Sequence, residues 1–280
     1  MQRHPYFDLL LHEEAELSAW LNDEVVERLT LHEWPLSCVH RLTCASGSKV
    51  IYKATRQPSV EPEFYAAARS PLLVSARTVY RQKPYACLLV EYLECPTLDK
   101  VSMTEKDAVA LGRHLLTQIG AIQGDLPYTL DIASRERWLN YVAIILEGLQ
   151  SLLQAGSFVQ CRQDMVVRLE RWACSQAVLA AVEAHAGYVH SDLVGDNIFS
   201  QAGVWKVIDW QRPILGPVEL DLATLLASLG FRAEKYVPGE IVAIQKFLHI
   251  GWFCECATRW FPPGVETYDR QIAVLAQLIA

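Results

Sequence analysis

The chain is 280 residues long, 51% hydrophobic and 20% charged, and its formal net charge is −7. A chain of this length can form one large or two modest domains with a substantial buried core. The composition is typical of a folded globular protein, which excludes a disordered or collagen-like chain. The negative charge and the lack of a basic stripe argue against a nucleic-acid partner.

No apolar segment approaches the roughly 20 residues that a transmembrane helix requires. The apolar residues 9–11 are followed at once by a histidine and two glutamates, so the N-terminus predicts a helix and not a signal peptide. The eight cysteines are scattered, mostly through apolar segments, and the one close pair, Cys254 and Cys256, lacks the spacing of a zinc site. We therefore expect reduced thiols in a cytoplasmic protein without a membrane partner.

The first third of the chain predicts an antiparallel sheet. Apolar residues at helical spacing among acidic ones predict a leading helix over residues 7–26. Strand-like segments then flank a small polar turn at residues 45–48, and Pro62 opens a short helix that ends near residue 68. The predicted strands cover residues 36–43, 50–55, 79–81 and 86–92.

From residue 95 onward the pattern changes to long helical periodicity. This change predicts an α+β protein with an N-terminal lobe, residues 1–94, made of antiparallel β-sheet with one inserted helix behind the leading one. Residues 95–280 would form a larger, mainly helical C-terminal lobe. Its expected elements are helices over residues 106–122, 135–154 and 164–185, short strands and loops over 187–208, and helices beginning near residues 220, 237 and 268.

The polar insert carries the pattern His-x-Asp-x-x-x-x-Asn at His190, Asp192 and Asn197, followed by Asp209 after a short apolar run. This arrangement matches the kinase catalytic loop, in which the aspartate serves the acceptor hydroxyl while the asparagine and the later aspartate bind magnesium. Each residue alone is more commonly a turn or cap residue. Their joint spacing beside apolar strands favours a phosphoryl-transfer site.

The N-terminal third offers a lysine at the position that such a site needs. Lys53 ends an apolar strand and is predicted to reach the phosphates of ATP. Glu63, on the helix that follows, is the favoured partner of this lysine because it lies inside the helix, whereas Glu61 precedes Pro62 and is the competing candidate. A solvated helix N-terminus would explain either acid.

The strand at residues 88–93 resembles the connection between kinase lobes, whose backbone could bond an adenine edge. Glu91 and Leu93 are the candidate nucleotide-binding positions there. An ordinary buried strand with an edge glutamate explains the same residues.

Together these residues resemble the aminoglycoside phosphotransferase and choline kinase-like family of small-molecule kinases, over nearly the whole chain. The resemblance rests on residues 50–53, Glu63, residues 89–93, residues 190–197, the triplet Ile208-Asp209-Trp210, Gly216-Pro217, and Asp221-Leu222-Ala223. It implies a two-lobed protein-kinase-like fold.

The resemblance also implies residue roles. Asp192 would be the catalytic base, Asn197 and Asp209 would bind Mg²⁺, and Lys53 would contact the phosphates of ATP. Asp221 would brace the catalytic loop from a helix, and His190 would order that loop.

Two features depart from the usual kinase pattern. No glycine-rich G-x-G-x-x-G precedes Lys53, so phosphate binding would fall to the hairpin around Gly47. Asp196 stands where the family often has a small residue, and we assign it no role.

The sequence therefore predicts a kinase that transfers the γ-phosphoryl group of ATP to a hydroxyl of a small molecule, such as an aminoglycoside-like antibiotic, an amino alcohol or a sugar. A nucleotide-binding pseudokinase or regulatory module is the alternative. A protein kinase is disfavoured because Asp209-Trp210-Gln211 replaces Asp-Phe-Gly and no Ala-Pro-Glu follows.

Overall fold

The computed structural model describes residues 1–201 and 203–279. The chain divides into two compact units that are discontinuous in sequence. The first unit contains residues 1–102, 121–129 and 195–213, and the second contains residues 103–120, 130–194 and the chain from Ile214 onward. A single boundary after residue 94 cannot represent this division, because two later segments belong to the first unit.

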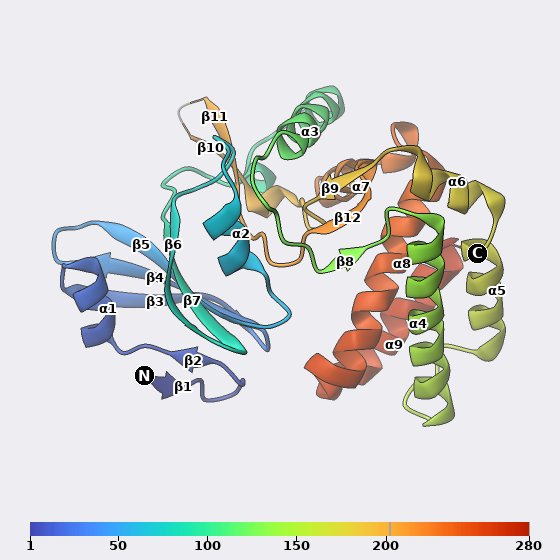
Figure 1. Ribbon diagram of the computed structural model, residues 1–280, viewed down its shortest axis with the longest axis horizontal. Coiled ribbons are helices and arrows are strands. Elements are labelled where there is room, and N and C mark those ends of the chain that lie inside the picture. The colour runs from blue at the N-terminus through green and yellow to red at the C-terminus, as the bar shows by residue number, and fades with distance from the viewer. Residues whose placement is uncertain (202, 280) are drawn as a thin grey trace. The chain divides into compact units, whose positions relative to one another are not determined.

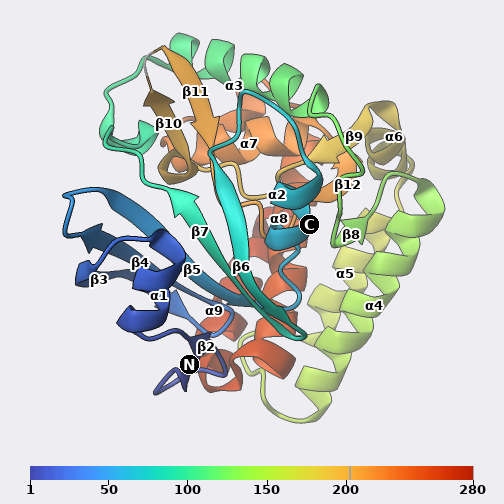
Figure 2. The ribbon, with the colours of Figure 1, turned by 60° about the vertical axis from the view of Figure 1, so that its left-hand side comes forward.

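The first unit is built on a five-stranded antiparallel sheet in the order β3-β4-β5-β7-β6 (Figure 1). A short pair, β1 and β2, and helix α1 precede this sheet, and helix α2 lies beside β6 (Figures 1 and 2). The bounds are β1 Gln2–Arg3, β2 Leu10–Leu11, α1 Glu14–Leu21, β3 Val25–Trp34, β4 Ser37–Cys44, β5 Lys49–Arg56, α2 Glu61–Ala67, β6 Ala76–Gln82 and β7 Tyr85–Glu91.

Alternation along β5 separates the two faces of this sheet. Tyr52 belongs to an apolar cluster with Leu17 of α1 and Leu89 of β7. Its hydroxyl lies 2.9 Å from His12 Nδ1 and donates to Cys87 Sγ. The next residue, Lys53, therefore points to the opposite face of the sheet.

A later hairpin, β10 Ile198–Gln201 and β11 Val204–Val207, completes the first unit together with the short helices η1 Leu98–Lys100 and η2 Gly195–Asn197. The Val207 N–H donates to the Leu72 carbonyl at 2.9 Å, and Lys206 Nζ donates to the carbonyls of Pro71 and Leu73. These bonds attach the hairpin to the segment between α2 and β6.

The second unit is mainly helical, with a small sheet in the order β8-β12-β9. Figure 2 shows α4 and α5 side by side. The bounds are α3 Glu105–Gly120, β8 Leu130–Asp131, α4 Arg135–Gln154, α5 Gln163–Ala173, α6 Gln176–Ala184, β9 Ala186–Val189, β12 Ile214–Pro217, α7 Glu219–Ser228, η3 Ala233–Lys235, α8 Gly239–Glu255, η4 Cys256–Trp260, η5 Pro262–Gly264 and α9 Val265–Ile279.

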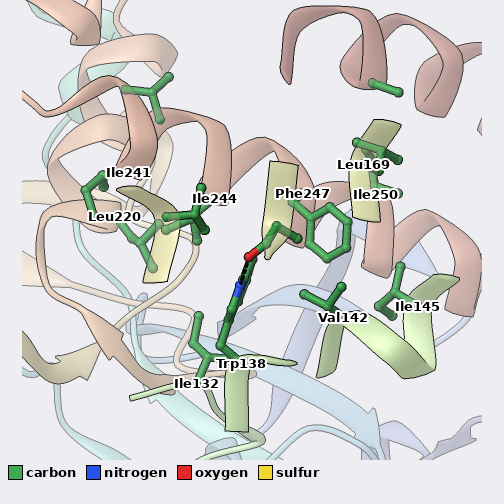
Figure 3. Packing of buried hydrophobic residues seen from close by; sticks show 14 of the residues in the cluster. Ile132, Trp138, Val142, Ile145, Leu169, Leu220, Ile241, Ile244, Phe247 and Ile250 are labelled. Atoms are coloured by element: carbon green, nitrogen blue, oxygen red, sulfur yellow. Dashed lines mark hydrogen bonds between the residues drawn. The ribbon is translucent and has the colours of Figure 1, made fainter. Parts of the chain in front are cut away.

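Trp138 of α4 is at the centre of the apolar core of this unit (Figure 3). Its ring is fully buried and meets the edges of Trp172 and Phe247 at centroid distances of 6.2 and 5.5 Å. Its indole N–H donates to the Ala173 carbonyl at 3.0 Å, where α5 ends. The Trp138 side chain therefore packs in the apolar core and also satisfies a carbonyl group at the C-terminal end of α5.

Several expected elements are wrong in their bounds. The leading helix covers only Glu14–Leu21, because β2 lies before it within the expected range and β3 begins at Val25. Strand β3 is an edge strand whose side chains are mostly exposed, so it lacks the alternation that would have revealed it. The helix expected over residues 164–185 breaks after Ala173, and the Ser175 side chain caps the new helix α6.

All eight cysteines lie in the described part of the chain and are free thiols. None of the described helices has the length and apolarity needed to cross a membrane.

Replacing Trp138 tests the core of the second unit. Trp138→Ala should lower the free energy of unfolding by about 3–5 kcal/mol, because it removes buried aromatic surface and leaves a cavity. Ile144→Ala is the control on the same helix, where the side chain is 57% exposed, and it should change stability by less than about 0.5 kcal/mol. Urea denaturation measures both, and equal effects would contradict this view of the core.

Candidate active site

The first unit contains a buried ion cluster of Lys53, Glu61 and Asp209. Lys53 on β5 is only 6% exposed, and its Nζ lies 2.6 Å from Glu61 Oε2. The same ammonium donates to Asp209 Oδ1, which follows β11. Gln211 Nε2 also donates to that oxygen, at 2.5 Å. Two consecutive elements, β5 and α2, thus meet a loop 156 residues after Lys53 at one amine.

The expectation that Glu63 pairs with Lys53 is wrong. Glu63 forms an ion pair with Arg81 of β6 at a partly exposed position, whereas Glu61 is the buried partner of the lysine. Helix α2 begins at Glu61 and includes Pro62 in its first turn. Glu61 lies three residues before the buried Phe64 and therefore shares its face of the helix, while Glu63 lies on another face.

Charge pairing stabilises the ammonium in this cluster. Burial alone would lower the pKa of Lys53, but the carboxylates of Asp209 and Glu61 outweigh it and raise the pKa. Burial also raises the pKa of Glu61, although Lys53 and a backbone hydrogen bond from Trp210 oppose that shift. The lysine is therefore cationic at neutral pH.

Helix α2 is attached directly to the loop that carries Asp209. The Val60 N–H donates to the Gln211 carbonyl at 3.0 Å. The rings of Phe64 and Trp210 stack with centroids 4.3 Å apart and an interplanar angle of 11°. Both aromatic side chains are fully buried, so Glu61 and Asp209 belong to one packed assembly.

Asn197 and Asp209 flank the open end of the β10–β11 hairpin. Asn197 immediately precedes β10, Asp209 follows β11, and the Ile208 N–H donates to the Asn197 carbonyl at 3.0 Å. A carboxylate and an amide are hard oxygen donors of the kind that Mg²⁺ prefers. The chemistry of these two side chains therefore fits a magnesium ion, and the hairpin brings the two residues to the same end.

The loop that carries Asp192 belongs to the second unit and is braced by Asp221 of α7. Asp221 is 1% exposed and accepts hydrogen bonds from the backbone N–H groups of His190, at 2.8 Å, and Ser191, at 2.9 Å. The Asp192 N–H in turn donates to His190 Nδ1 at 3.2 Å. Asp221 and His190 thus act on the backbone around Asp192, and the Asp192 side chain is only half-buried.

Two residues of the motif adopt the left-handed backbone region that favours glycine. Ser191 has φ 69° and Asp209 has φ 68°. Among the other non-glycine residues in the described ranges only Asn22 does so, and it caps the end of α1. Left-handed residues without such a capping role concentrate at functional sites, because surrounding contacts must hold them in place.

The candidate hinge residues lie at the end of β7. Leu93 is buried in the apolar cluster that contains Val90. The Glu91 side chain accepts a hydrogen bond from the Ser75 N–H at 3.0 Å and another from Gln201 Nε2. Adenine contacts at Glu91 and Leu93 stay a prediction.

Asp196 and the turn around Gly47, the two departures from the usual kinase pattern, both lie in polar surroundings. Asp196 is exposed and lies close enough to raise the pKa of Lys100, after the larger effect of Asp99. In the β4–β5 turn, Gly47 has φ 85°, and the Ser46 hydroxyl donates to Asp23 at 2.5 Å.

Outside the ion cluster, His4, Glu33 and Cys38 bring possible metal-binding atoms within 4.8 Å of one another. His4 Nε2 lies 2.9 Å from Glu33 Oε2, while His4 Nδ1 accepts from the N–H groups of Tyr6 and Phe7. Nδ1 therefore carries no proton, whereas a metal-bound histidine normally donates from its second nitrogen. This group anchors the N-terminal segment and does not fit a metal site.

Comparison with known proteins gives one family and many similar structures. The family model described as the phosphotransferase enzyme family matches residues 62–248, which is more than half of the chain. No curated protein matches the sequence.

Among solved structures, a choline/ethanolamine kinase family protein from Mesorhizobium loti has a TM-score of 0.66 at 14% identity, over 95% of this chain and 93% of that one. A thermostable mutant of aminoglycoside phosphotransferase APH(4)-Ia, in a ternary complex with ADP and hygromycin B, has a TM-score of 0.63 at 13% identity, over 95% and 98%. A spectinomycin phosphotransferase in complex with ADP and spectinomycin has 0.57 at 12%, over 96% and 98%.

At these identities the similarity is one of fold. It confirms the predicted α+β, protein-kinase-like fold.

The buried Asp221 predicts a pH-dependent contribution to stability. Burial raises its pKa to about 6, above 3.8 for an ordinary aspartate. A raised folded-state pKa adds stability below pH 4 that is lost as pH rises through 6, by up to about 3 kcal/mol. The Asp221→Asn variant should not show this loss of stability as the pH rises.

Urea denaturation of both proteins between pH 4 and 7 measures the effect. The stability difference, wild type minus variant, should decrease across that range. A constant difference would contradict the raised pKa of Asp221.

Proposed function

The chain belongs to the phosphotransferase enzyme family, as its motifs indicate, and from this membership we propose that it is an ATP- and magnesium-dependent small-molecule kinase. The single observation that carries the proposal is the buried Lys53 held between Glu61 and Asp209, because phosphoryl transfer needs a fixed cation beside a metal-binding carboxylate.

In this proposal Lys53 contacts the phosphates of ATP, and Glu61 keeps the lysine amine in place. The ligand-free cluster supports this division, since Glu61 is 2% exposed and cannot leave the amine without remaining buried and unpaired. Asp209 is the more exposed of the two acids, with 26% of its side chain accessible, so it is the carboxylate that a ligand can reach.

Asn197 and Asp209 would hold Mg²⁺, which neutralises the charge of the transferring phosphoryl group. Glu91 and Leu93 would contact the adenine. Asp192 would accept the proton of the acceptor hydroxyl, with His190 and Asp221 holding its loop. The two backbone bonds to Asp221 support this role because they fix the loop without using the Asp192 carboxylate.

The acceptor would be a small molecule with a hydroxyl group, and we propose that the reaction takes place in the cytoplasm, where free thiols persist. Similar structures bind hygromycin B or spectinomycin, or belong to the choline/ethanolamine kinase family. Their chemistry supports an aminoglycoside-like compound, an amino alcohol or a sugar as the acceptor class.

A thermal-shift screen with Mg²⁺–ATP across aminoglycosides, amino alcohols and sugars tests the proposal, followed by measurement of ADP and phosphorylated product. We expect a nucleotide-dependent rise in Tm and turnover with one acceptor class. Failure to bind nucleotide would overturn the proposal. Nucleotide binding without turnover of any acceptor would favour the pseudokinase alternative.

Two aspartate variants separate the proton-accepting and metal-binding roles. Asp192→Asn should retain Mg²⁺–ATP binding and lose about 10²–10⁴-fold in kcat, since general-base catalysis contributes roughly that much. Asp209→Asn should also weaken Mg²⁺–ATP binding because it removes a metal ligand. Calorimetry and steady-state kinetics measure both effects.

The control is Asp164→Asn on the exposed surface of α5, which should match the wild type. Full turnover by Asp192→Asn would rule out the role given to that residue.

The two glutamates of α2 offer a matched pair of variants. Glu61→Gln should lower kcat/KM for ATP by about 10- to 100-fold, the equivalent of one charged hydrogen bond. Glu63→Gln makes the same chemical change at the Arg81 pair, where a partly exposed salt bridge contributes little, and should stay within about twofold. Equal losses in both variants would contradict the assignment of Glu61.

A further inference from the structure

The Tyr65 hydroxyl is a buried polar group without a hydrogen-bond partner in the described part of the chain. Its ring packs against an apolar cluster that contains Val74, Leu88 and Val90. Leu88 is paired with Lys53 in the register of β5 and β7, so this cluster includes the face of the sheet to which Lys53 points. An unsatisfied buried hydroxyl is costly to a folded protein, and such groups in native structures call for an explanation.

The position of Tyr65 directs attention to the ion cluster. Tyr65 lies four residues after Glu61 on α2, so the two side chains share one face of the helix. Burial raises the pKa of Tyr65 well above its usual value, and the carboxylates of Glu61 and Asp209 raise it further. The hydroxyl is therefore a protonated O–H donor within electrostatic reach of both acids.

Contacts at both ends of α2 restrict its movement, so the Tyr65 hydroxyl cannot easily reach another hydrogen-bond acceptor in the protein. Phe64, its neighbour, is stacked on Trp210, and the Val60 N–H is bonded to Gln211. At the other end of the helix, a Cβ on Gly124 would lie 2.3 Å from the Ala67 carbonyl oxygen, so backbone packs tightly there. Helix α2 is fixed at both ends, so the position of the Tyr65 hydroxyl is fixed as well.

We propose that Tyr65 is a ligand-contacting residue whose hydroxyl donates a hydrogen bond to an oxygen of the bound magnesium–nucleotide. The proposal rests on the proposed function, because it requires that nucleotide binds at Lys53 and Asp209. The oxygen acceptor is either a phosphate oxygen or a water of the metal ion. Either oxygen would give the Tyr65 hydroxyl a hydrogen-bond acceptor that it lacks in the ligand-free protein.

This assignment has a thermodynamic signature that a structural tyrosine lacks. Removing an unpaired buried hydroxyl should increase the stability of the ligand-free protein. The same change removes a hydrogen bond from the nucleotide complex and should weaken binding. Tyr65→Phe should therefore raise the Tm of the ligand-free protein by a few degrees, about 2–4 °C for a chain of this size. The same variant should bind Mg²⁺–ATP about tenfold more weakly, as expected for one hydrogen bond to an anionic group.

Tyr52→Phe is the matched control. Tyr52 precedes Lys53 on β5 but belongs to the opposite face, and its hydroxyl is satisfied by His12 and Cys87. Its replacement should lower the Tm and leave the affinity for Mg²⁺–ATP unchanged.

Differential scanning fluorimetry without ligand, and calorimetric titration with Mg²⁺–ATP, ATP in EDTA, and Mg²⁺ alone, measure the two effects. Weaker binding of Tyr65→Phe to metal-free ATP as well would identify a phosphate oxygen as the acceptor. Weaker binding only when Mg²⁺ is present would identify a metal-bound water. Either result, together with the raised Tm, supports the proposal.

A lower Tm with unchanged affinity would overturn this assignment and make Tyr65 an ordinary core residue. Unchanged affinity with a raised Tm would overturn it as well. If the wild type itself bound no nucleotide, the proposed function would fall and the assignment with it. The wild-type titration therefore separates failure of the function from failure of the Tyr65 contact.

Discussion

The interaction on which the candidate site depends is the burial of the Lys53 ammonium between two carboxylates. A charged amine that is 6% exposed is tolerated only when it is paired. Its partners, Glu61 and Asp209, belong to α2 and to the loop after β11. One charge requirement therefore links β5 and the helix that follows it to a loop 156 residues after Lys53. Stacking of Phe64 on Trp210 makes the same link through apolar surface. Asp209 is thus positioned by pairing and packing, although it lies outside any helix or strand.

The same pairing couples metal and phosphate binding under the proposed function. A magnesium ion would bind the Asp209 carboxylate that Lys53 contacts in the structure, and the phosphates of ATP would give the lysine another anionic partner. Glu61 can stay with the amine during this exchange because it is buried beside it. Binding of either ligand would therefore favour binding of the other, which would be a favourable coupling free energy between them. An arrangement of one cation and two anions is suited to such an exchange, since one carboxylate remains after the other leaves.

The fold and the family could be predicted from the sequence more fully than the geometry of the candidate site. The fold and the family follow from the spacing of His190, Asp192 and Asn197 and from the later Asp209, because local spacing defines a loop motif. The position of Pro62 predicts where the helix begins but not which residues form its buried face, so it wrongly favours Glu63 over Glu61 as the partner of Lys53. The buried Phe64 lies in α2 three residues after Glu61, and the buried Ala68, which directly follows the helix, lies seven residues after it. This helical spacing indicates that Glu61 lies on the buried face of the helix.

Contacts between distant segments were beyond reach of the sequence pattern. The β10–β11 hairpin bonds to residues near position 72, more than a hundred residues earlier, so residues 195–213 join the first unit although a helical segment precedes them. The transition between units falls inside the motif itself: Asp192 is braced by Asp221 in the second unit, and Asn197 opens the hairpin of the first. Four residues of chain connect the two, so a motif that reads as one loop in sequence is built from two separately packed supports.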